Sequence, residues 1–257
     1  MIIVISPAKA LDFKTKANTA LYSDIAFGDE AAQLVEEMRK LSPEELGELM
    51  KISPNLSELN FTRFHEWQLP FNPKNAKQAL LAFNGEVFNG IQAKTLTDEG
   101  LEFAQNHLRI LSGLYGVLRP LDLIQAYRLE MGTKKSFGLN KNLYEFWSDK
   151  VTANLNEELE KQGQSVLINL ASNEYFKAIN KKKLNAEVIT PQFKQSKDGS
   201  YKMIAIFAKK ARGLMTRFII DNDITDPEEL KAFDVDGYFF NNELSKGNNW
   251  VFTRQYQ

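Results

Sequence analysis

The sequence predicts a single α+β domain over residues 1–257, built around a mixed β-sheet. Helical hydrophobic patterns dominate the first half of the chain, whereas the period changes to two from Ser165 onwards, which is typical of strands. The fully apolar, β-branched run at residues 2–5 predicts a buried central strand, which must find its partners later in the chain. No Ser-, Gly- or Pro-rich linker divides the chain and no segment repeats, so we expect one domain.

The first half predicts a series of helices. Residues 29–41 place apolar side chains on one helical face. Ser42, Pro43 and Glu45 form a helix start, with a cap, a proline at the first helical position and the acid of a capping box. Further helices are expected at residues 53–67, 75–80, 86–91, 97–111 and 142–162.

The second half predicts strands alternating with shorter helices. Asp198-Gly199 is the strongest hairpin signal in the chain, and a second hairpin is expected around Gly247. Helices are expected at residues 172–179 and 209–220, and after Thr225. Strands are expected at residues 126–131, 166–170, 187–194, 201–207, 238–244 and 249–253.

Composition excludes several classes of site. The chain has no cysteine and only two histidines, His65 and His107. It therefore lacks disulfides, a thiol nucleophile, Cys-ligated zinc and a site with three histidine ligands from one chain. Neither histidine follows a glutamate by three positions, which excludes the Glu-x-x-His pair of di-iron helix bundles. We expect no metal and no cofactor.

The hydropathy pattern predicts a protein without a membrane segment. The apolar runs are far shorter than the roughly 20 residues that a spanning helix needs. The N-terminal stretch lacks the basic region of a signal peptide. We therefore expect a cytoplasmic protein.

Positive charge is concentrated in residues 177–217. This segment has eleven Lys and Arg residues and two acids, a net charge of +9, whereas the whole chain has a net charge of −1. Such a concentration attracts phosphate-rich partners, and the alternative is a solvated lysine surface. Lys209 and Lys210 fall in the first turn of the helix expected at 209–220, where the helix dipole disfavours cations, so a bound anion would compensate them. Gly213, in mid-helix, would allow a backbone to approach closely.

Two loops supply further candidates for phosphate binding. Arg119 and Arg128 lie near a glycine-containing turn beside aromatic residues and suit phosphate contact, although structural pairs with Asp122 or Glu130 are the alternative. Gly113 and Gly116 follow a predicted helix, and their turn is similar to a helix-hairpin-helix, in which backbone N–H groups bind one phosphate. A plain interhelical turn is the alternative.

The loop after the first strand carries Ser6 and Lys9 at a spacing that occurs in acyl-transfer enzymes, where the lysine deprotonates the serine. The Lys-Thr-Gly motif of those enzymes is absent. We therefore favour Lys9 as an anion-binding residue.

The candidates together predict an interface with DNA. We expect Lys9, Arg119, Arg128 and the three cations at 209, 210 and 212 to line one basic cleft. Contacts from these side chains and from glycine turns meet phosphates, so binding should be largely independent of sequence. The full set of candidate DNA-binding residues is Lys9, Gly113, Gly116, Arg119, Arg128, Lys209, Lys210, Arg212 and Arg217.

Long, ordered blocks along the chain resemble the bacterial YaaA family. These blocks lie at residues 5–9, 111–122, 127–132, 169–176 and 208–218. The resemblance implies a cytoplasmic protein of the peroxide-stress response that limits damage linked to free intracellular iron. It also implies one unusual α/β fold with a basic cleft, a helix-hairpin-helix element and binding to double-stranded or distorted DNA.

Two alternative hypotheses about function stay open. The resemblance implies no established reaction, and an enzyme acting on a nucleotide or nucleic acid would use the Ser6 and Lys9 loop. A protein that lowers free iron is the other alternative, although the lack of cysteine and of Glu-x-x-His speaks against direct iron storage.

Overall fold

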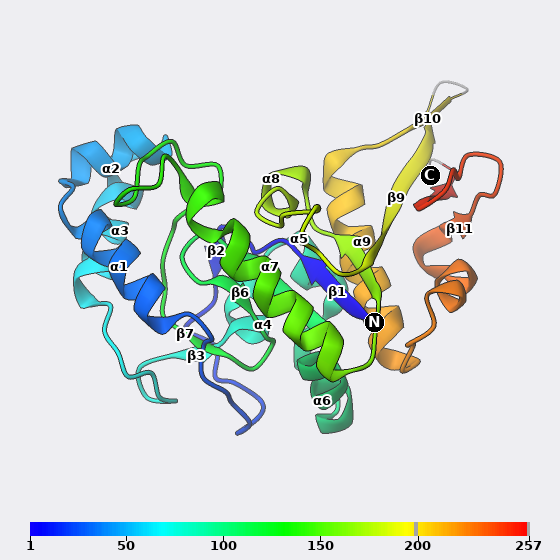
Figure 1. The fold of residues 1–257 in the computed structure, drawn as a ribbon, viewed down its shortest axis with the longest axis horizontal. Coiled ribbons are helices and arrows are strands. Elements are labelled where there is room, and N and C mark those ends of the chain that lie inside the picture. The colour runs from blue at the N-terminus through cyan, green and yellow to red at the C-terminus, as the bar shows by residue number, and fades with distance from the viewer. Residues whose placement is uncertain (198–199, 256–257) are drawn as a thin grey trace.

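A mixed eight-stranded sheet forms the centre of the computed structural model, which describes residues 1–197 and 200–255 (Figure 1). The strand order is β11-β12-β9-β8-β1-β5-β6, and β10 pairs with β9. The prediction of a mixed sheet is confirmed. Its strands are β1 (Ile2–Ile5), β5 (Leu108–Ser112), β6 (Gly116–Leu118), β8 (Val166–Leu170), β9 (Glu187–Lys197), β10 (Ser200–Lys202), β11 (Phe239–Phe240) and β12 (Asn249–Arg254).

Strand β1 lies in the middle of this sheet, as its apolar sequence predicts. It pairs in parallel with β5 on one side and with β8 on the other, and all four of its residues are buried. Strand β9 is parallel to β8, and β12 is parallel to β9. These strands therefore end at one edge, here called the carboxyl edge. Ligands of open α/β sheets bind outside the carboxyl ends of the strands, at the point where the strand order reverses.

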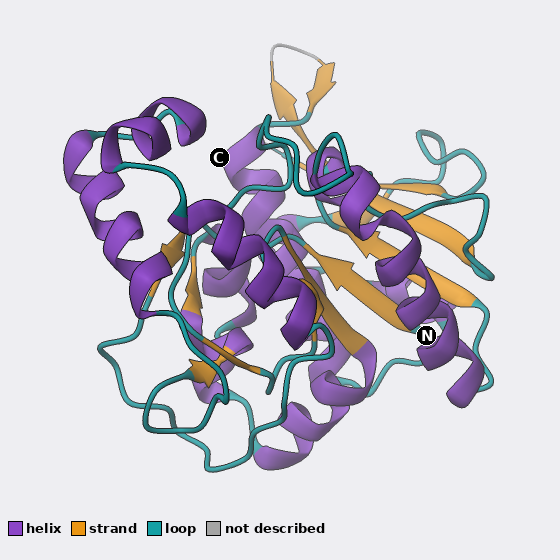
Figure 2. Ribbon diagram, turned by 60° about the vertical axis from the view of Figure 1, so that its left-hand side comes forward, coloured by secondary structure: helices purple, strands orange, loops and turns teal. Residues whose placement is uncertain are grey.

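Helices surround the sheet (Figure 2). A group of three, α1, α2 and α3, forms one side of the molecule, and α7 crosses in front of the sheet in Figure 1. The helices are α1 (Gly28–Arg39), α2 (Pro43–Met50), α3 (Pro54–Glu66), α4 (Ala79–Ala82), α5 (Glu86–Ile91), α6 (Asp98–His107), α7 (Leu143–Lys161), α8 (Asn173–Phe176) and α9 (Ala205–Asp221), with 3-10 turns η1 (Ala93–Thr95), η2 (Pro227–Ala232) and η3 (Val235–Gly237). Two small sheets pair β2 (Ala10–Leu11) with β4 (Phe83–Asn84) and β3 (Lys77–Gln78) with β7 (Leu123–Ile124).

Local capping signals placed several helices correctly. The Ser42 side chain accepts a hydrogen bond from the backbone of Glu45, and the Glu45 side chain completes the capping box. The Thr97 and Asn142 side chains cap α6 and α7 by accepting hydrogen bonds from the backbone N–H groups of Gly100 and Glu145, without a capping box. None of the described helices is long and apolar enough to cross a bilayer.

Other elements differ from the prediction because their residues pair with strands that are distant in the sequence. The helix expected at 97–111 ends at His107, because the next residues form β5 beside β1. Residues 75–80 contain β3 and the start of α4 rather than one helix, and residues 126–131 form no strand. The expected hairpin around Asp198-Gly199 is formed by β9 and β10, while its two turn residues lie outside the described residues.

The helix-hairpin-helix prediction is wrong at residues 113–116. The turn joins two strands, since β5 and β6 pair in antiparallel fashion on either side of it. A side chain at Gly113 would overlap the carbonyl oxygen of Leu129, and Gly116 has a φ of +69° under the ring of Trp147. The turn is buried, so Gly113 and Gly116 serve packing, and their backbone is covered by neighbouring residues.

Candidate nucleic-acid interface

Many cations of the basic segment, residues 177–217, have no acidic partner among the described residues. Lys183 lies 2.8 Å from Asp149, and Arg217 lies 2.7 Å from Asp221. Within the part of the chain that the structure describes, seven other cations of the segment form no ion pair, and they are Lys177, Lys181, Lys182, Lys194, Lys202, Lys209 and Arg212.

Five of these seven belong to elements that meet at the carboxyl edge. Lys177 directly follows α8, which begins where β8 ends. Lys194 and Lys202 lie on the β9–β10 hairpin, and Lys209 and Arg212 lie in the first half of α9, which starts three residues after β10 (Figure 1). We call these five residues the edge cations.

Arg212 has the least favourable surroundings among the edge cations. It is half-buried between Ala208 and Thr216, which lie one turn away on either side and are themselves buried. Burial lowers the pKa of its guanidinium, which nevertheless stays charged at neutral pH. Its side chain has neither an ion pair nor a hydrogen bond within residues 1–197 and 200–255. Because a desolvated charge without a partner is costly, this position favours an anion.

Helix α9 starts earlier than its sequence predicts. It begins at Ala205, so Lys209 and Lys210 stand in its second turn, beyond the part of the helix where the dipole acts strongly. The argument that these lysines need an anion to offset the dipole is therefore wrong. The close backbone approach expected at Gly213 is present, but the approaching backbone is Val87 of α5.

Lys9 and Arg128 share one acid at the carboxyl edge. The Lys9 ammonium lies 2.8 Å from one oxygen of Glu130, and the Arg128 guanidinium lies 3.3 Å from the other. The Nε atom of Arg128 is buried and has no hydrogen-bond partner among the described residues. Two cations on one carboxylate leave this cluster with a net positive charge.

Ser6 is hydrogen-bonded to Ser172 rather than to Lys9. The Ser6 hydroxyl accepts a hydrogen bond from the backbone N–H of Ser172 at 2.8 Å and donates to its hydroxyl at 3.2 Å. The Lys9 ammonium is held by Glu130. The geometry therefore does not place the lysine as a base for the serine, which the nucleophile alternative requires.

Arg119 and Arg217 are tied into the protein. Arg119 donates to the buried carboxylate of Asp122 at 3.0 Å and to the carbonyl of Asp24 at 2.9 Å. Burial raises the pKa of Asp122, and the charge of Arg119 opposes this shift. Arg217 donates to Asp221 and to carbonyl groups at the end of α5, including that of Ile91 at 3.2 Å. Both arginines therefore hold loops in place.

The structure divides the predicted cations among separate groups. Lys9 and Arg128 meet at Glu130, whereas Lys209, Lys210 and Arg212 share α9. Arg119 lines a small cavity of about 140 Å³ that is distinct from the cavity lined by Lys210. One common cleft for all six residues stays a prediction.

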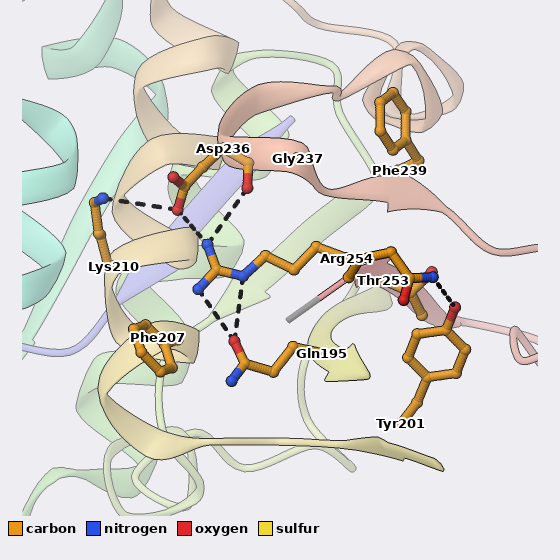
Figure 3. Close-up of a pocket in the computed structure, with 10 residues that line it drawn as sticks. Gln195, Tyr201, Phe207, Lys210, Asp236, Gly237, Phe239, Thr253 and Arg254 are labelled. Carbon is orange, nitrogen blue, oxygen red and sulfur yellow. Dashed lines mark hydrogen bonds and ion pairs between the residues drawn. The ribbon is translucent and has the colours of Figure 1, made fainter. Parts of the chain in front are cut away.

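A larger cavity, of about 600 Å³, lies where β9 and β12 end (Figure 3). Arg254 occupies its centre, with its guanidinium 4.9 Å from the ring centroid of Phe207 and 4.7 Å from that of Tyr238. Lys210 lies at the cavity and pairs loosely with Asp236 at 3.6 Å. Sequence reasoning missed this cavity, and the only signal was the density of aromatic residues near the end of the chain.

Metal ligands do not gather in the described residues. No group of three or more His, Asp or Glu side chains among residues 1–197 and 200–255 is arranged to hold a metal ion.

The family comparison agrees with the resemblance of the sequence blocks. A family model described as peroxide stress protein YaaA matches residues 1–244. The match includes each of the candidate residues named from the sequence, whereas β12 lies beyond it. Because the match covers nearly the whole chain, this protein belongs to the YaaA family of peroxide stress proteins.

Proposed function

We propose that this chain is a DNA-binding protein of the peroxide-stress response, which limits iron-linked oxidative damage. It binds duplex or distorted DNA at the carboxyl edge without strong sequence specificity. Membership of a peroxide-stress family supports the stress role. The observation that carries DNA binding is the set of edge cations without acidic partners, above all the half-buried Arg212.

The edge cations suit phosphate rather than base contacts. Lys209 and Arg212 are three residues apart on α9, which places them about 60° apart around the helix. An ammonium binds phosphate as a point charge, and a guanidinium binds it through two parallel N–H groups. Such contacts fix a protein on the duplex but carry no sequence information.

The same contacts offer a route to lower iron-linked damage. Cations that neutralise DNA phosphates release the counterions condensed there. Fe²⁺ is one such counterion in a cell with free iron, so binding of this protein moves iron away from DNA. This route requires no iron site in the protein.

Fluorescence anisotropy of labelled 20-base-pair duplexes over a range of salt tests DNA binding. Wild-type affinity should fall steeply with salt and should agree for two unrelated sequences. Lys209→Ala/Arg212→Ala should lose at least tenfold in affinity. The slope of log affinity against log salt concentration should become less steep by about 0.9 per lost phosphate contact. Lys202→Ala/Lys209→Ala, at two exposed positions, gives the same test without disturbing a half-buried residue.

Lys14→Ala/Lys16→Ala is the matched control. Both lysines are exposed, form no ion pair among the described residues and belong to the loop between β2 and α1. This variant should bind as the wild type does. Equal affinities and slopes for all the variants, or a strong preference for one of the two sequences, would contradict the proposal.

A further inference from the structure

We infer that the cavity at the ends of β9 and β12 binds one unstacked nucleobase of the DNA; this inference rests on the proposed function and adds a site to it. We call the cavity the base pocket and define it by Gln195, Tyr201, Phe207, Lys210, Phe239 and Arg254. Strands β9 and β12 are parallel, and Gln195 pairs in register with Arg254. The base pocket therefore opens at the carboxyl edge, beside the edge cations of α9.

Exposed aromatic rings surround the base pocket. Phe239 is 60% exposed and Tyr201 is 37% exposed, although both are large apolar residues. Figure 3 shows Phe239 and Tyr201 above and below the backbone of Arg254, and Phe207 near its guanidinium. Exposed rings on a cavity wall are typical of sites that stack unpaired bases, because each base offers a flat π-face. An aliphatic ligand would bury apolar area against these rings but would gain no stacking.

Arg254 is held rigidly in the wall of the base pocket. Its Nε and one terminal nitrogen donate to the side-chain oxygen of Gln195 at 3.2 and 3.1 Å. Its other terminal nitrogen donates to the Asp236 carboxylate at 2.6 Å. The rings of Phe207 and Tyr238 pack against the guanidinium. A guanidinium fixed in this way holds the wall of the base pocket rigid, so little side-chain freedom is lost when a base enters.

Gln195 supplies a hydrogen-bond donor without a partner. Its side-chain oxygen accepts both hydrogen bonds from Arg254. These bonds fix the orientation of the amide, with the NH₂ group directed away from Arg254. Gln195 is 2% exposed, and this nitrogen has no hydrogen-bond partner among the described residues. A buried donor left unsatisfied is unfavourable. Each nucleobase carries acceptor atoms on its edge, so a base that displaces the side chains covering this nitrogen would satisfy the donor.

Size and charge also suit a nucleotide within a strand. The cavity of about 600 Å³ falls within the range of roughly 300–1,000 Å³ that is typical of ligand pockets. Lys210 lies at the base pocket, and its weak pair with Asp236 leaves it able to reach a phosphate. Unstacking a base costs least where it is already unpaired, so occupancy should be greatest at bulged nucleotides.

The test compares two duplexes that differ only in the presence of one base. Both carry a one-nucleotide bulge at the centre, with adenine in one and an abasic tetrahydrofuran residue in the other. Wild-type protein should bind the adenine bulge roughly five- to a hundredfold more tightly, which corresponds to the stacking energy of one base. A ratio near one in the wild type would overturn the base pocket.

Two variants assign the effect to these residues. Gln195→Glu keeps an acceptor for Arg254 but removes the free donor, and Phe239→Ala removes an exposed ring. Each should bring the ratio to within about twofold of one. Leu139→Ala, at a fully exposed apolar position outside the base pocket, should keep the wild-type ratio. Wild-type ratios in both Gln195→Glu and Phe239→Ala would overturn the inference.

The fully paired duplex separates this inference from the proposed function. If the wild type binds it but does not distinguish the two bulges, the base pocket is refuted and DNA binding stands. If the wild type binds none of the three duplexes, the proposed function itself fails, and the base pocket fails with it.

Discussion

At the scale of single residues, Glu130 lowers the positive charge that Lys9 and Arg128 present at the carboxyl edge. It is the shared partner of Lys9 and Arg128, and its side chain is 24% exposed. A phosphate that approaches these cations therefore meets a carboxylate that repels it and competes for both partners. The acid holds the loop after β1 in place, but it weakens anion binding there.

Glu130→Gln should strengthen DNA binding. Neutralising this carboxylate frees Lys9 and Arg128, so affinity at low salt should rise about three- to tenfold and its salt dependence should steepen. The free energy of unfolding should fall by about 1–3 kcal/mol, because Arg128 loses its charged partner. Anisotropy titrations and urea unfolding measure the two effects.

Glu36→Gln is the control for this substitution. Glu36 pairs with Arg39 on α1 and is 64% exposed, so its loss should leave DNA affinity unchanged. Weaker DNA binding by Glu130→Gln would show that the loop position matters more than its charge.

The pairing of individual arginines was partly accessible from sequence. The alternatives of Arg119 with Asp122 and Arg128 with Glu130 were visible because the partners are two or three residues apart, and both pairs are present. The stacking of Arg254 on Phe207 joins residues that are distant in sequence, so no local pattern could reveal it.

At the scale of elements, two glycines allow α5 and α9 to cross at short distance. A side chain at Gly213 would overlap the carbonyl oxygen of Val87, and one at Gly90 would overlap the backbone of α9 near Lys210. This crossing fixes the first half of α9, which carries Lys209 and Arg212. The position of these edge cations therefore depends on two residues that have no side chain.

Gly213→Ala should destabilise the protein by about 1–3 kcal/mol, despite the better helix propensity of alanine. The added methyl group meets rigid backbone on α5, so the helices must separate and lose packing. Urea unfolding followed by circular dichroism measures the change.

Gly100→Ala in α6 is the matched control. A side chain there would make only ordinary contacts, at 3.4 Å or more, so propensity alone predicts a gain of up to about 1 kcal/mol. Opposite signs for the two substitutions would confirm the role of the crossing. A stabilised Gly213→Ala protein would contradict it.

Elements whose signals are local were predicted well, and elements set by distant contacts were not. The capping box at Ser42 and the caps at Thr97 and Asn142 give correct helix starts, because caps depend on residues three positions apart. The segment after His107 continues a helical pattern but becomes β5, because a place beside β1 stabilises it more as a strand. The same cause converted the predicted helix-hairpin-helix into a strand turn.

At the scale of the whole molecule, one sheet connects the base pocket to the opposite end of the fold. The order from β11 to β6 is continuous, so the strands around Trp250 and those near Trp147 belong to one hydrogen-bonded array. We therefore expect a single cooperative unfolding transition.

Tryptophan variants test this expectation. Trp250→Phe leaves Trp67 and Trp147, which are buried near the β5–β6 turn. Trp67→Phe/Trp147→Phe leaves only Trp250, on β12. Within each variant, urea midpoints from tryptophan fluorescence and from far-UV circular dichroism should coincide. An earlier fluorescence midpoint in the protein that keeps only Trp250 would show that the β9–β12 region unfolds as a separate unit.

The central place of β1 has a consequence for folding during synthesis on the ribosome. Ile3 pairs with Leu108 and with Ile168, so neither neighbour exists when this strand leaves the ribosome. At about 5–20 residues per second, the second partner emerges roughly 8–30 s after the first residues. During that interval a wholly apolar, β-branched segment has no sheet to join, and such segments aggregate readily. Newly made molecules should therefore depend on chaperones that bind nascent chains far more than the finished fold does.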